Sequence, residues 1–457
     1  MKLLAHHLLL LLMLVSFTGA TAAKSPHSRI KGPFTSGPDV TQTCLTCHQE
    51  EAEEFIKDVH WTWSTVQHIP ARDKKTELGK KAGINNFCIA VPSNWQRCTS
   101  CHAGYGWKDA TFDFTALENI DCLVCHDTTG LYKKNPTGAG FPAEEVDLEI
   151  VVKNVGRTSR RTCGTCHFYG GGGDHVKHGD LDSSLLMPTR EYDVHMGKDG
   201  PDMACQFCHQ TANHKIPGQA MSVSAGEGER IGCIGCHRPA PHQSENLNDH
   251  TDAVACQTCH IPVFAKQKPT KVWGDWSKAG EDRKPEKDQF GLETYTKNQG
   301  EMRWDKNIVP TYAWYSGKSE RYILGDKMTP DRPVALTRPL GSIEDMKAKI
   351  FPFKVMEGRQ PYDMINNYLA VPKLFEGFWS HFDWNRAISD GMAAAGLKYS
   401  GKFGFARTKM YWRINHMVAP GEQALTCSDC HGERGRLDWK SLGYKGDPKE
   451  FGGRRKN

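Results

Sequence analysis

The mature part of this chain has no long apolar segment and few residues suited to a protein core. Hydrophobic residues make up 38% of the 457 residues, whereas glycine and proline contribute 44 and 24. After the first 23 residues, no run approaches the roughly 20 apolar residues that a membrane-spanning helix needs. We therefore predict no membrane span in the mature protein, and we expect something other than side chains to fill much of its interior.

The first 23 residues have the pattern of a secretory signal peptide. Lys2 supplies the positive start, residues 8–17 form a short apolar core, and small residues at 20–23 suit cleavage. The apolar core is too short to cross a membrane. The sequence therefore predicts export and a periplasmic location for the mature chain.

Cysteine is almost absent outside one short motif. Of the 17 cysteines, 16 belong to eight copies of Cys-x-x-Cys-His. The cysteine pairs are Cys44 and Cys47, Cys98 and Cys101, Cys122 and Cys125, Cys163 and Cys166, Cys205 and Cys208, Cys233 and Cys236, Cys256 and Cys259, and Cys427 and Cys430. The histidines that close the motifs are His48, His102, His126, His167, His209, His237, His260 and His431.

Each motif has the form of a covalent attachment site for haem c. Two thiols form thioethers with the porphyrin, and the histidine that follows ligates the iron. In a helical turn these three residues share one face, so a single porphyrin can meet all of them. One such motif could instead bind zinc or act in thiol redox chemistry, but eight copies after a secretory signal predict eight covalent haems. Any structural disulfide would cost a haem, and only Cys88 is left over.

The porphyrins are expected to act as the core. We predict a mainly α fold with much irregular loop, built around a covalent haem cluster and with a helical C-terminal region. The predicted organisation is a signal peptide over 1–23, a region with seven motifs over 24–265, and a region over 266–457 that returns to the cluster with the eighth motif.

Three segments carry more specific predictions of secondary structure. A helix is expected over residues 49–68, because acidic residues near its start favour the helix dipole. Residues 266–361 contain no motif and predict turns and short strands, with no visible function. Residues 362–419 predict more helix.

The net charge gives no sign of a nucleic-acid partner. The formal value is +5, and the ionised propionates of eight haems would make the holoprotein negative. We therefore exclude nucleic acid as a partner.

Enough histidines remain to supply second iron ligands. Any one of them is more often a surface residue, but the number of haems favours ligation, and iron held by two histidines transfers electrons without an open position. The predicted distal ligands are drawn from His60, His68, His175, His178, His195, His214, His242, His250, His381 and His416. His27 is set apart because it follows closely on the signal peptide.

The segment 170–180 (GGGGDHVKHGD) concentrates polar side chains after four glycines. Glycine permits close approach of the backbone to a ligand, and Asp174, His175, Lys177 and His178 follow within five positions. The segment is either a solvated loop with one distal histidine or the lining of an active site. In both cases we expect His175 or His178 to ligate a second haem.

With its eight motifs, its glycine-led loop and a lone cysteine ten residues before the second motif, the chain resembles the octahaem tetrathionate reductases. These are periplasmic relatives of the hydroxylamine oxidoreductases and the pentahaem nitrite reductases. The resemblance covers the whole mature chain in haem number and order, and residues 85–102 and 170–180 are its most specific parts.

The resemblance implies a catalytic haem at the second motif. That haem would have His102 as its proximal ligand and Lys177 as its distal ligand, with Asn85, Cys88 and Asp174 over its distal face. The other seven haems would be held by two histidines each. The chain lacks the Cys-x-x-Cys-Lys motif of the nitrite reductases, and no tyrosine can be assigned to the cross-link of the hydroxylamine oxidoreductases.

The sequence and the resemblance together predict a multihaem reductase of a small substrate. Tetrathionate would be reduced to thiosulfate, with nitrite and hydroxylamine reduced to ammonia, and the electrons would come from a partner cytochrome or a quinol dehydrogenase. The alternatives are a non-catalytic electron conduit and a hydroxylamine oxidoreductase. Cys88 is either a small buried residue or a thiolate that attacks the central S–S bond of tetrathionate.

Overall fold

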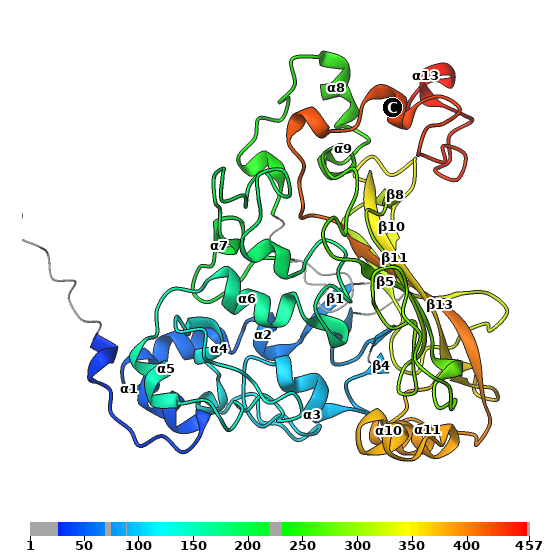
Figure 1. Ribbon diagram of the computed structural model, residues 1–457. Coiled ribbons are helices and arrows are strands. Elements are labelled where there is room, and N and C mark those ends of the chain that lie inside the picture. Colours follow the sequence, from blue (N-terminus) through cyan, green and yellow to red (C-terminus); the bar gives the residue numbers. More distant parts are fainter. Residues whose placement is uncertain (1–25, 69–74, 88, 219–230, 455–457) are drawn as a thin grey trace, which may run out of the picture.

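The computed structural model describes residues 26–68, 75–87, 89–218 and 231–454 of the chain. The predicted signal peptide and Cys88 lie outside these residues, as do the side chains of residues 67, 68 and 89. Helices and loops that carry the motifs occupy one side of the molecule, and a large sheet occupies the other (Figure 1).

Each motif lies on a short helix or at its end. These helices are α1 (Gly37–Phe55), α3 (Trp95–Cys98) with η2 (Thr99–Cys101), α4 (Leu123–His126), α6 (Arg160–His167), α7 (Cys205–Cys208), η6 (Cys233–Gly235), α9 (Cys256–His260) and α12 (Cys427–Cys430). The other helices before residue 266 or after residue 413 are η1 (Pro26–Arg29), α2 (Val59–Thr62), η3 (Leu117–Asn119), α5 (Leu148–Lys153), η4 (Gly170–Gly172), η5 (Ser183–Leu186), α8 (Glu245–His250), η9 (Gly421–Gln423) and α13 (Pro448–Phe451).

The prediction of a helix over residues 49–68 was wrong at both ends. Helix α1 begins at Gly37, because Ser36 caps it by accepting a hydrogen bond from the amide of Asp39 at 3.3 Å. The helix kinks at His48 and ends at Phe55. Trp63 then takes a left-handed conformation with φ of 51°, which stops α2 and directs the chain into strand β1 (Ser64–His68).

The prediction of a mainly α fold was also wrong, because residues 270–413 build a mixed sheet of nine strands. Its main order is β6-β7-β5-β11-β13-β10-β9, and β8 and β12 also pair with β11. These strands are β5 (Thr270–Asp275), β6 (Tyr295–Thr296), β7 (Gly300–Asp305), β8 (Thr311–Tyr315), β9 (Lys318–Arg321), β10 (Val334–Leu340), β11 (Lys349–Asp363), β12 (Tyr368–Leu369) and β13 (Phe403–Arg413). Two small hairpins, β1 with β2 (Lys75–Gly79) and β3 (Ile84–Asn85) with β4 (Ile89–Ala90), lie before the second motif.

The centre of the sheet is the long antiparallel pair β11–β13, aligned from Phe353↔Arg413 to Asp363↔Phe403. Strand β13 falls in the region predicted to be helical. Its buried residues alternate with exposed or half-buried ones, and this period of two is typical of a strand. The buried set is Ala406, Thr408, Met410 and Trp412.

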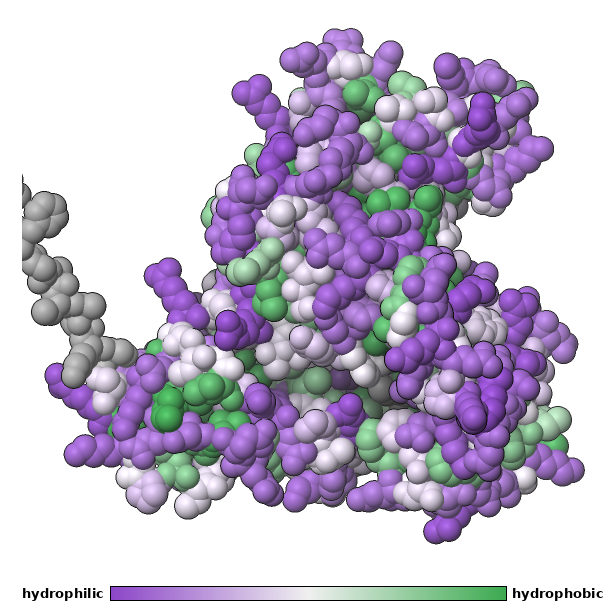
Figure 2. Space-filling model, in the orientation of Figure 1, coloured by the Kyte–Doolittle hydropathy of each residue, from purple (hydrophilic) through white to green (hydrophobic). Residues whose placement is uncertain are grey.

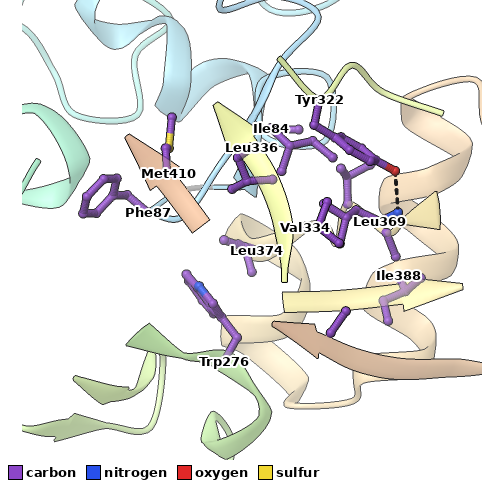
Figure 3. Close-up of a cluster of buried hydrophobic side chains, with 14 of the residues drawn as sticks. Ile84, Phe87, Trp276, Tyr322, Val334, Leu336, Leu369, Leu374, Ile388 and Met410 are labelled. Carbon is purple, nitrogen blue, oxygen red and sulfur yellow. Dashed lines mark hydrogen bonds between the residues drawn. The ribbon is translucent and has the colours of Figure 1, made fainter. Parts of the chain in front are cut away.

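Apolar side chains pack on both the sheet and the helices that cover its end (Figure 3). Helix α11 (Trp384–Ala394) begins where Asp383 accepts a hydrogen bond from the amide of Arg386 at 3.1 Å, and it buries Ile388 and Met392. A Cβ atom at Gly391 would lie 1.9 Å from the carbonyl oxygen of Val371, so only glycine permits this approach. Two shorter helices, η8 (Leu374–Phe378) and α10 (Trp379–His381), precede α11, and η7 (Trp276–Lys278) follows β5.

The face shown in Figure 2 is largely hydrophilic, and its apolar side chains gather in separate patches. Among the described residues, no helix has the length and apolar content to cross a membrane.

Candidate functional site

Cysteines of different motifs lie beside one another, which shows how the attachment sites follow each other in space. Four pairs are close enough for a side-chain hydrogen bond: Cys44 with Cys122, Cys101 with Cys166, Cys163 with Cys205, and Cys233 with Cys256. Longer-range electrostatic contacts join Cys125 with Cys166, Cys208 with Cys236, and Cys259 with Cys430.

These contacts order the motifs as a line with one branch. The line runs from the first motif through the third, fourth, fifth, sixth and seventh to the eighth. The second motif joins this line at the fourth, through the contact of Cys101 with Cys166. The spatial order therefore differs from the order along the sequence.

Five motif histidines face a second histidine across a similar gap. The ring centroids lie 6.0–6.2 Å apart in the pairs His27 with His48, His60 with His167, His195 with His237, His242 with His260, and His250 with His431. Four of these second histidines were predicted as distal ligands. His27 is a residue that the sequence reasoning set aside.

The gap between these rings fits a haem iron. Two metal–nitrogen bonds of about 2 Å and the two ring radii together span about 6 Å. A porphyrin supplies four further ligands, so two imidazoles complete the coordination. Among the described residues, no group of three or more His, Cys, Asp or Glu side chains could hold a metal ion without such a macrocycle.

Five of the ten predicted distal histidines are oriented by a hydrogen bond to Nδ1, which leaves Nε2 for a metal, as is usual for metal-bound histidine. The acceptors are Asp58 for His60 (2.8 Å), Glu54 for His214 (3.2 Å), Asn248 for His242 (3.2 Å), the carbonyl of Asn246 for His250 (2.5 Å), and Asp180 for His416 (3.1 Å). His416 also acts electrostatically on His209, which places it beside the fifth motif.

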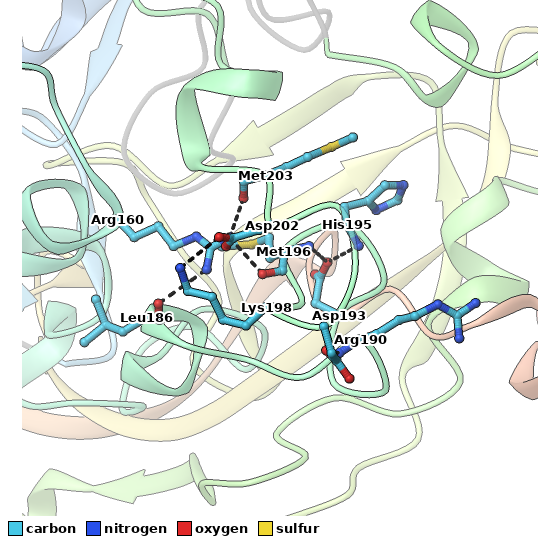
Figure 4. A network of polar contacts seen from close by, with 10 residues as sticks. Arg160, Leu186, Arg190, Asp193, His195, Met196, Lys198, Asp202 and Met203 are labelled. Atoms are coloured by element: carbon cyan, nitrogen blue, oxygen red, sulfur yellow. Dashed lines mark hydrogen bonds and ion pairs between the residues drawn. The ribbon is translucent and has the colours of Figure 1, made fainter. Parts of the chain in front are cut away.

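His195 is positioned by a polar network around a buried guanidinium (Figure 4). Arg160 donates to the carbonyl oxygens of Met196 and Met203 at 2.8 and 2.7 Å and pairs with Asp202 at 2.9 Å. Asp193 accepts hydrogen bonds from the amides of His195 and Met196 at 3.0 Å each. The loop is thereby fixed on α6, and His195 faces His237.

His102, which closes the second motif, differs from the other motif histidines. His126, His209 and His431 each use Nδ1 for a hydrogen bond and leave Nε2 for a metal. At His102 the Nε2 atom bonds to the carbonyl oxygen of Trp61 at 2.7 Å, and the buried Nδ1 atom has no hydrogen-bond partner among the described residues. Ligation of iron through Nε2 and this hydrogen bond therefore exclude each other.

Aromatic rings enclose His102 completely. They belong to Trp61, Trp63, Trp107, Phe112 and Phe114, with ring centroids 4.8–6.3 Å away. Burial lowers the pKa of His102 to about 3, so the ring is neutral.

A buried polar cluster holds the backbone at His102. Lys134 donates to the carbonyl oxygen of His102 and pairs with Asp121 at 2.9 Å. Tyr105 and Tyr132 donate to the same carboxylate at 2.8 and 2.9 Å. Each charge in the cluster is thus compensated, as burial requires.

The two segments that carry the family resemblance meet on the sheet. A Cβ atom at Gly171 would lie 3.1 Å from the ring of Phe87, which joins the glycine-led loop to the segment before the second motif. The Phe87 ring packs on Trp412 of β13 at 6.0 Å, and the Lys177 amine lies 4.9 Å from the centroid of the same indole. The region around Phe87, Lys177 and Trp412 is therefore the candidate active site.

Strand β11 anchors both segments. The side-chain amide of Asn86 donates to the carbonyl oxygen of Met356 at 2.9 Å, and the side chain of Gln360 donates to the carbonyl oxygen of Asn85 at 3.0 Å. Lys354 donates to the carbonyl oxygens of Val176 and Lys177 at 3.1 and 2.9 Å. Residues 354, 356 and 360 alternate along one buried face of the strand.

Asp174 and Asn85 are engaged in holding these loops. Asp174 pairs with Lys268 and accepts from the amide and hydroxyl of Ser183 at 2.9 and 2.6 Å. Burial raises the pKa of the Asp174 carboxyl, but the hydrogen bonds outweigh it and lower the pKa below its usual value. The side-chain oxygen of Asn85 accepts from the amide of Phe87 at 2.8 Å.

Among the described residues, no ring contact joins His175, His178 or His381 to a motif histidine, although His178 interacts electrostatically with His167. His175 packs on Trp304 with centroids 5.6 Å apart, and His178 packs on Trp412 at 5.0 Å. Burial lowers the pKa of His178. His381 accepts from the amide of Asp383 at 3.0 Å on Nδ1, and its buried Nε2 has no partner in the described structure. Cys88 and the side chain of His68 lie outside the described residues.

Sequence reasoning missed Trp412 and Lys354, which support the loop of Lys177 from strands β13 and β11. One signal was present for Trp412. The alternation of buried residues along 406–412 belongs to a strand that ends at Arg413, three residues before His416, a predicted ligand.

Two family models match parts of the chain. Residues 271–434 match a model described as bacterial cytochrome c, and residues 43–127 match a model described as cytochrome c554 and c-prime. The chain is also 24% identical over 238 residues to an uncharacterized protein of Archaeoglobus fulgidus, a match that covers 41% of this chain and 79% of that one.

A solved structure resembles nearly the whole molecule. It is the crystal structure of an octaheme cytochrome c from Shewanella oneidensis, 53% identical to this chain, with a TM-score of 0.89. The match covers 93% of this chain and 98% of that one.

Proposed function

Since the chain belongs to the octahaem c-type cytochromes, we propose that it is a periplasmic reductase with a haem at each of its eight motifs. The resemblance to the octahaem tetrathionate reductases supports tetrathionate as its substrate and nitrite and hydroxylamine as further substrates. A partner cytochrome or quinol dehydrogenase would supply the electrons. When bound, the haems provide the electron path and, at the second motif, a coordination position for the substrate.

The observation that carries this proposal is the meeting of two distant segments on Trp412. Phe87, from the segment that leads into the second motif, and Lys177, from the loop after the fourth, both contact this indole. Because Cys101 of the second motif also contacts Cys166 of the fourth, the same two motifs adjoin at their attachment sites. These contacts support placing Lys177 at the second haem.

Lysine differs from histidine as a ligand in a way that suits a reductase. Its amine must be unprotonated to bind a metal, so binding is coupled to proton release. If a substrate took its place, the Lys177 amine could take up a proton and would lie over the face of Trp412, where the ring would stabilise a cation. The positive charge then favours an anionic substrate beside it.

The side chains around Lys177 hold its loop rather than exchange protons with it. Asp174 is paired with Lys268 and Ser183, so its role in this proposal is to fix the loop that carries Lys177. Asn85 fixes the turn at Phe87 in the same way. Together these contacts fix the positions of the Lys177 loop and the Phe87 turn relative to each other.

The reaction with tetrathionate needs electrons alone. Two electrons break the central S–S bond, and the two halves leave as two thiosulfate anions. Cys88 is proposed to assist as a thiolate that attacks one central sulfur and releases the first thiosulfate, and the two electrons then reduce the mixed disulfide and release the second. Reduction of nitrite to ammonia takes six electrons and also consumes protons.

An electron conduit without catalysis is the second candidate, and the line of adjoining motifs from the first to the eighth favours it. A steady-state assay separates the two. The wild-type protein and the Lys177→Ala variant are supplied with a reduced dye and with tetrathionate, nitrite or hydroxylamine in turn. A reductase turns over at least one substrate and responds to the substitution, whereas a conduit oxidises the dye with none of them.

A further inference from the structure

Trp412 is a buried hydrogen-bond donor without an acceptor. Its side chain is 3% exposed, and its Nε1 atom has no hydrogen-bond partner in the described structure. An indole N–H can donate but not accept, and a buried donor without a partner lowers stability. Trp412 lies on a regular strand and pairs with Lys354, so the local backbone does not explain why its N–H lacks an acceptor.

The surroundings of Trp412 belong to the candidate active site. Lys177 lies over its ring at 4.9 Å, the His178 ring lies at 5.0 Å, and the Phe87 ring lies at 6.0 Å. These residues come from the two loops that the sequence singled out. The unpartnered N–H is therefore placed where a substrate would bind.

The polar groups near Trp412 indicate whether a ligand bound there is an anion or a cation. The carboxylates of this region already have partners, because Asp174 pairs with Lys268 and Asp180 pairs with His416. The amine of Lys354, the cross-strand neighbour of Trp412, is already engaged with Val176, Lys177 and Thr270. The Trp412 N–H and the Lys177 ammonium thus form a pair of donors suited to an anion.

We propose that Trp412 is a substrate-binding residue whose indole N–H donates to an oxygen of a small oxyanion held beside Lys177. The oxyanion is nitrite or one sulfonate end of tetrathionate. This inference rests on the proposed function and deepens it. A carboxylate of the haem itself, a propionate, is the other acceptor of the same chemistry, and the experiment separates the two.

The experiment compares Trp412→Phe with the wild-type protein. The substitution keeps an aromatic ring for Lys177 and Phe87 and removes only the N–H. The dissociation constant for nitrite is measured from the change in the haem absorption spectrum. We expect it to rise about 10- to 100-fold, the loss typical of a hydrogen bond to a charged group. Binding of carbon monoxide to the reduced protein, a neutral ligand, should change by less than about twofold because it needs no donor.

Trp384→Phe provides a matched control. Within the described structure its indole Nε1 is also buried without a hydrogen-bond partner, but its ring stacks on that of Phe378 in η8 at 4.0 Å. Nitrite affinity should be unchanged in this variant. If Trp412→Phe does not fold with all its haems, infrared spectroscopy of the wild-type protein replaces it. The inference then requires that the indole N–H stretching band shifts when nitrite binds and stays unchanged when carbon monoxide binds.

Several results would overturn the inference. Equal loss of nitrite and carbon monoxide affinity would make Trp412 a packing residue. Unchanged nitrite affinity together with a shifted midpoint potential would assign the N–H to a propionate. A wild-type protein that binds nitrite but reduces no substrate would refute the proposed function and leave this inference standing. Undiminished nitrite affinity in a catalytically active Trp412→Phe variant would refute this inference and leave the proposed function standing.

Discussion

The side-chain amine of Lys354 donates to the carbonyl oxygen of Lys177 at 2.9 Å, although 177 residues separate the two lysines in the chain. Lys354 is fully buried on the central strand β11, and its other two hydrogen bonds go to Val176 and Thr270. Thr270 of β5 in turn donates to the same loop. The sheet formed by residues 270–413, for which the sequence suggested no function, thus supports the loop of the predicted catalytic lysine.

Replacing Lys354 should disturb the second haem before any other. Lys354→Met keeps much of the side-chain volume but leaves two carbonyl oxygens and a hydroxyl without their donor. We expect the free energy of unfolding to fall by about 1–4 kcal/mol, since burial lowers the pKa of Lys354 well below its usual value and each hydrogen bond of a neutral amine contributes about 0.5–1.5 kcal/mol. Electron paramagnetic resonance should show a changed signal from the lysine-ligated haem and unchanged signals from the bis-histidine haems.

Lys409→Met is the control for this substitution. Lys409 lies on the neighbouring strand β13 and forms a half-exposed ion pair with Glu357 at 3.2 Å. Such pairs contribute about 1 kcal/mol or less, so neither the stability nor the spectrum should change much. If both variants behave alike, Lys354 has no special relationship with the loop of Lys177.

Lys177→Ala should open the coordination of the second haem alone. Without the amine, that iron is expected to become five-coordinate or to bind water, since His102 would be the only protein side chain left as a ligand. Electron paramagnetic resonance should therefore show one new high-spin signal while the remaining haems keep their low-spin signals. A spectrum identical to that of the wild-type protein would make residues 170–180 an ordinary solvated loop.

The attachment sites could be predicted from the sequence because their chemistry is local. Two cysteines and a histidine within five residues define each motif, and no distant contact is needed to recognise it. The glycine-led loop around Lys177 was visible for the same reason. That this loop would meet the segment of Asn85 could be inferred only from the family resemblance.

The sheet could not be predicted in the same way. Its central pair joins Phe353 to Arg413 across 60 positions, and pairing at such a distance leaves no local signal beyond the alternation of buried residues. An alanine-rich helix, α11, lies between these strands and favoured a helical interpretation of the whole region. Tertiary pairing outweighed local propensity there.

The orientation of histidine rings was also beyond the sequence. His102 has the same motif context as His126, but enclosure by Trp61 and its aromatic neighbours gives its Nε2 atom a different partner. His27 was set aside because of its place near the start of the mature chain, yet its ring lies 6.1 Å from that of His48. Each of these features depends on which side chains the fold brings together.

The number of haems is the most direct prediction to test. All eight motifs should be loaded, because each contains two thiols and a histidine, and no cysteine of a motif is consumed by a disulfide in the described structure. At the second motif, loading requires His102 to give up the hydrogen bond from its Nε2 atom to Trp61. Intact-mass spectrometry of the mature protein, cleaved near Ala23, should show eight covalent porphyrins. A mass that accounts for fewer would remove at least one step of the proposed electron path.

His60 should be the distal ligand of the fourth haem. Its ring faces His167 across 6.1 Å, and Asp58 orients it through Nδ1 at 2.8 Å. His60→Ala is expected to convert one low-spin signal to a high-spin signal, whereas Asp58→Asn, which keeps an oxygen acceptor, should change that signal less. If His60→Ala leaves every low-spin signal in place, the gap between the two rings holds no iron.

Cys88 provides the test of substrate chemistry. It is the one cysteine outside the motifs, and it directly follows Phe87, whose ring contacts Trp412. A nearby metal ion or ammonium group lowers the pKa of a thiol and so raises the fraction of nucleophilic thiolate. Only tetrathionate offers an S–S bond for that thiolate to attack. Cys88→Ala should therefore impair reduction of tetrathionate at least about tenfold more than reduction of nitrite or hydroxylamine, a difference of about 1.4 kcal/mol in activation free energy.

Cys88→Ser separates nucleophilic attack from the shape of the pocket. Serine keeps nearly the volume of cysteine, but its hydroxyl is a far weaker nucleophile at neutral pH, so it should resemble Cys88→Ala with tetrathionate and the wild-type protein with nitrite. Rates on all three substrates are to be measured on variants that retain the full complement of haems. Equal loss on all substrates would make Cys88 a residue that shapes the pocket. Full activity of both variants would place it outside the site, and the electrons alone would then have to break the S–S bond.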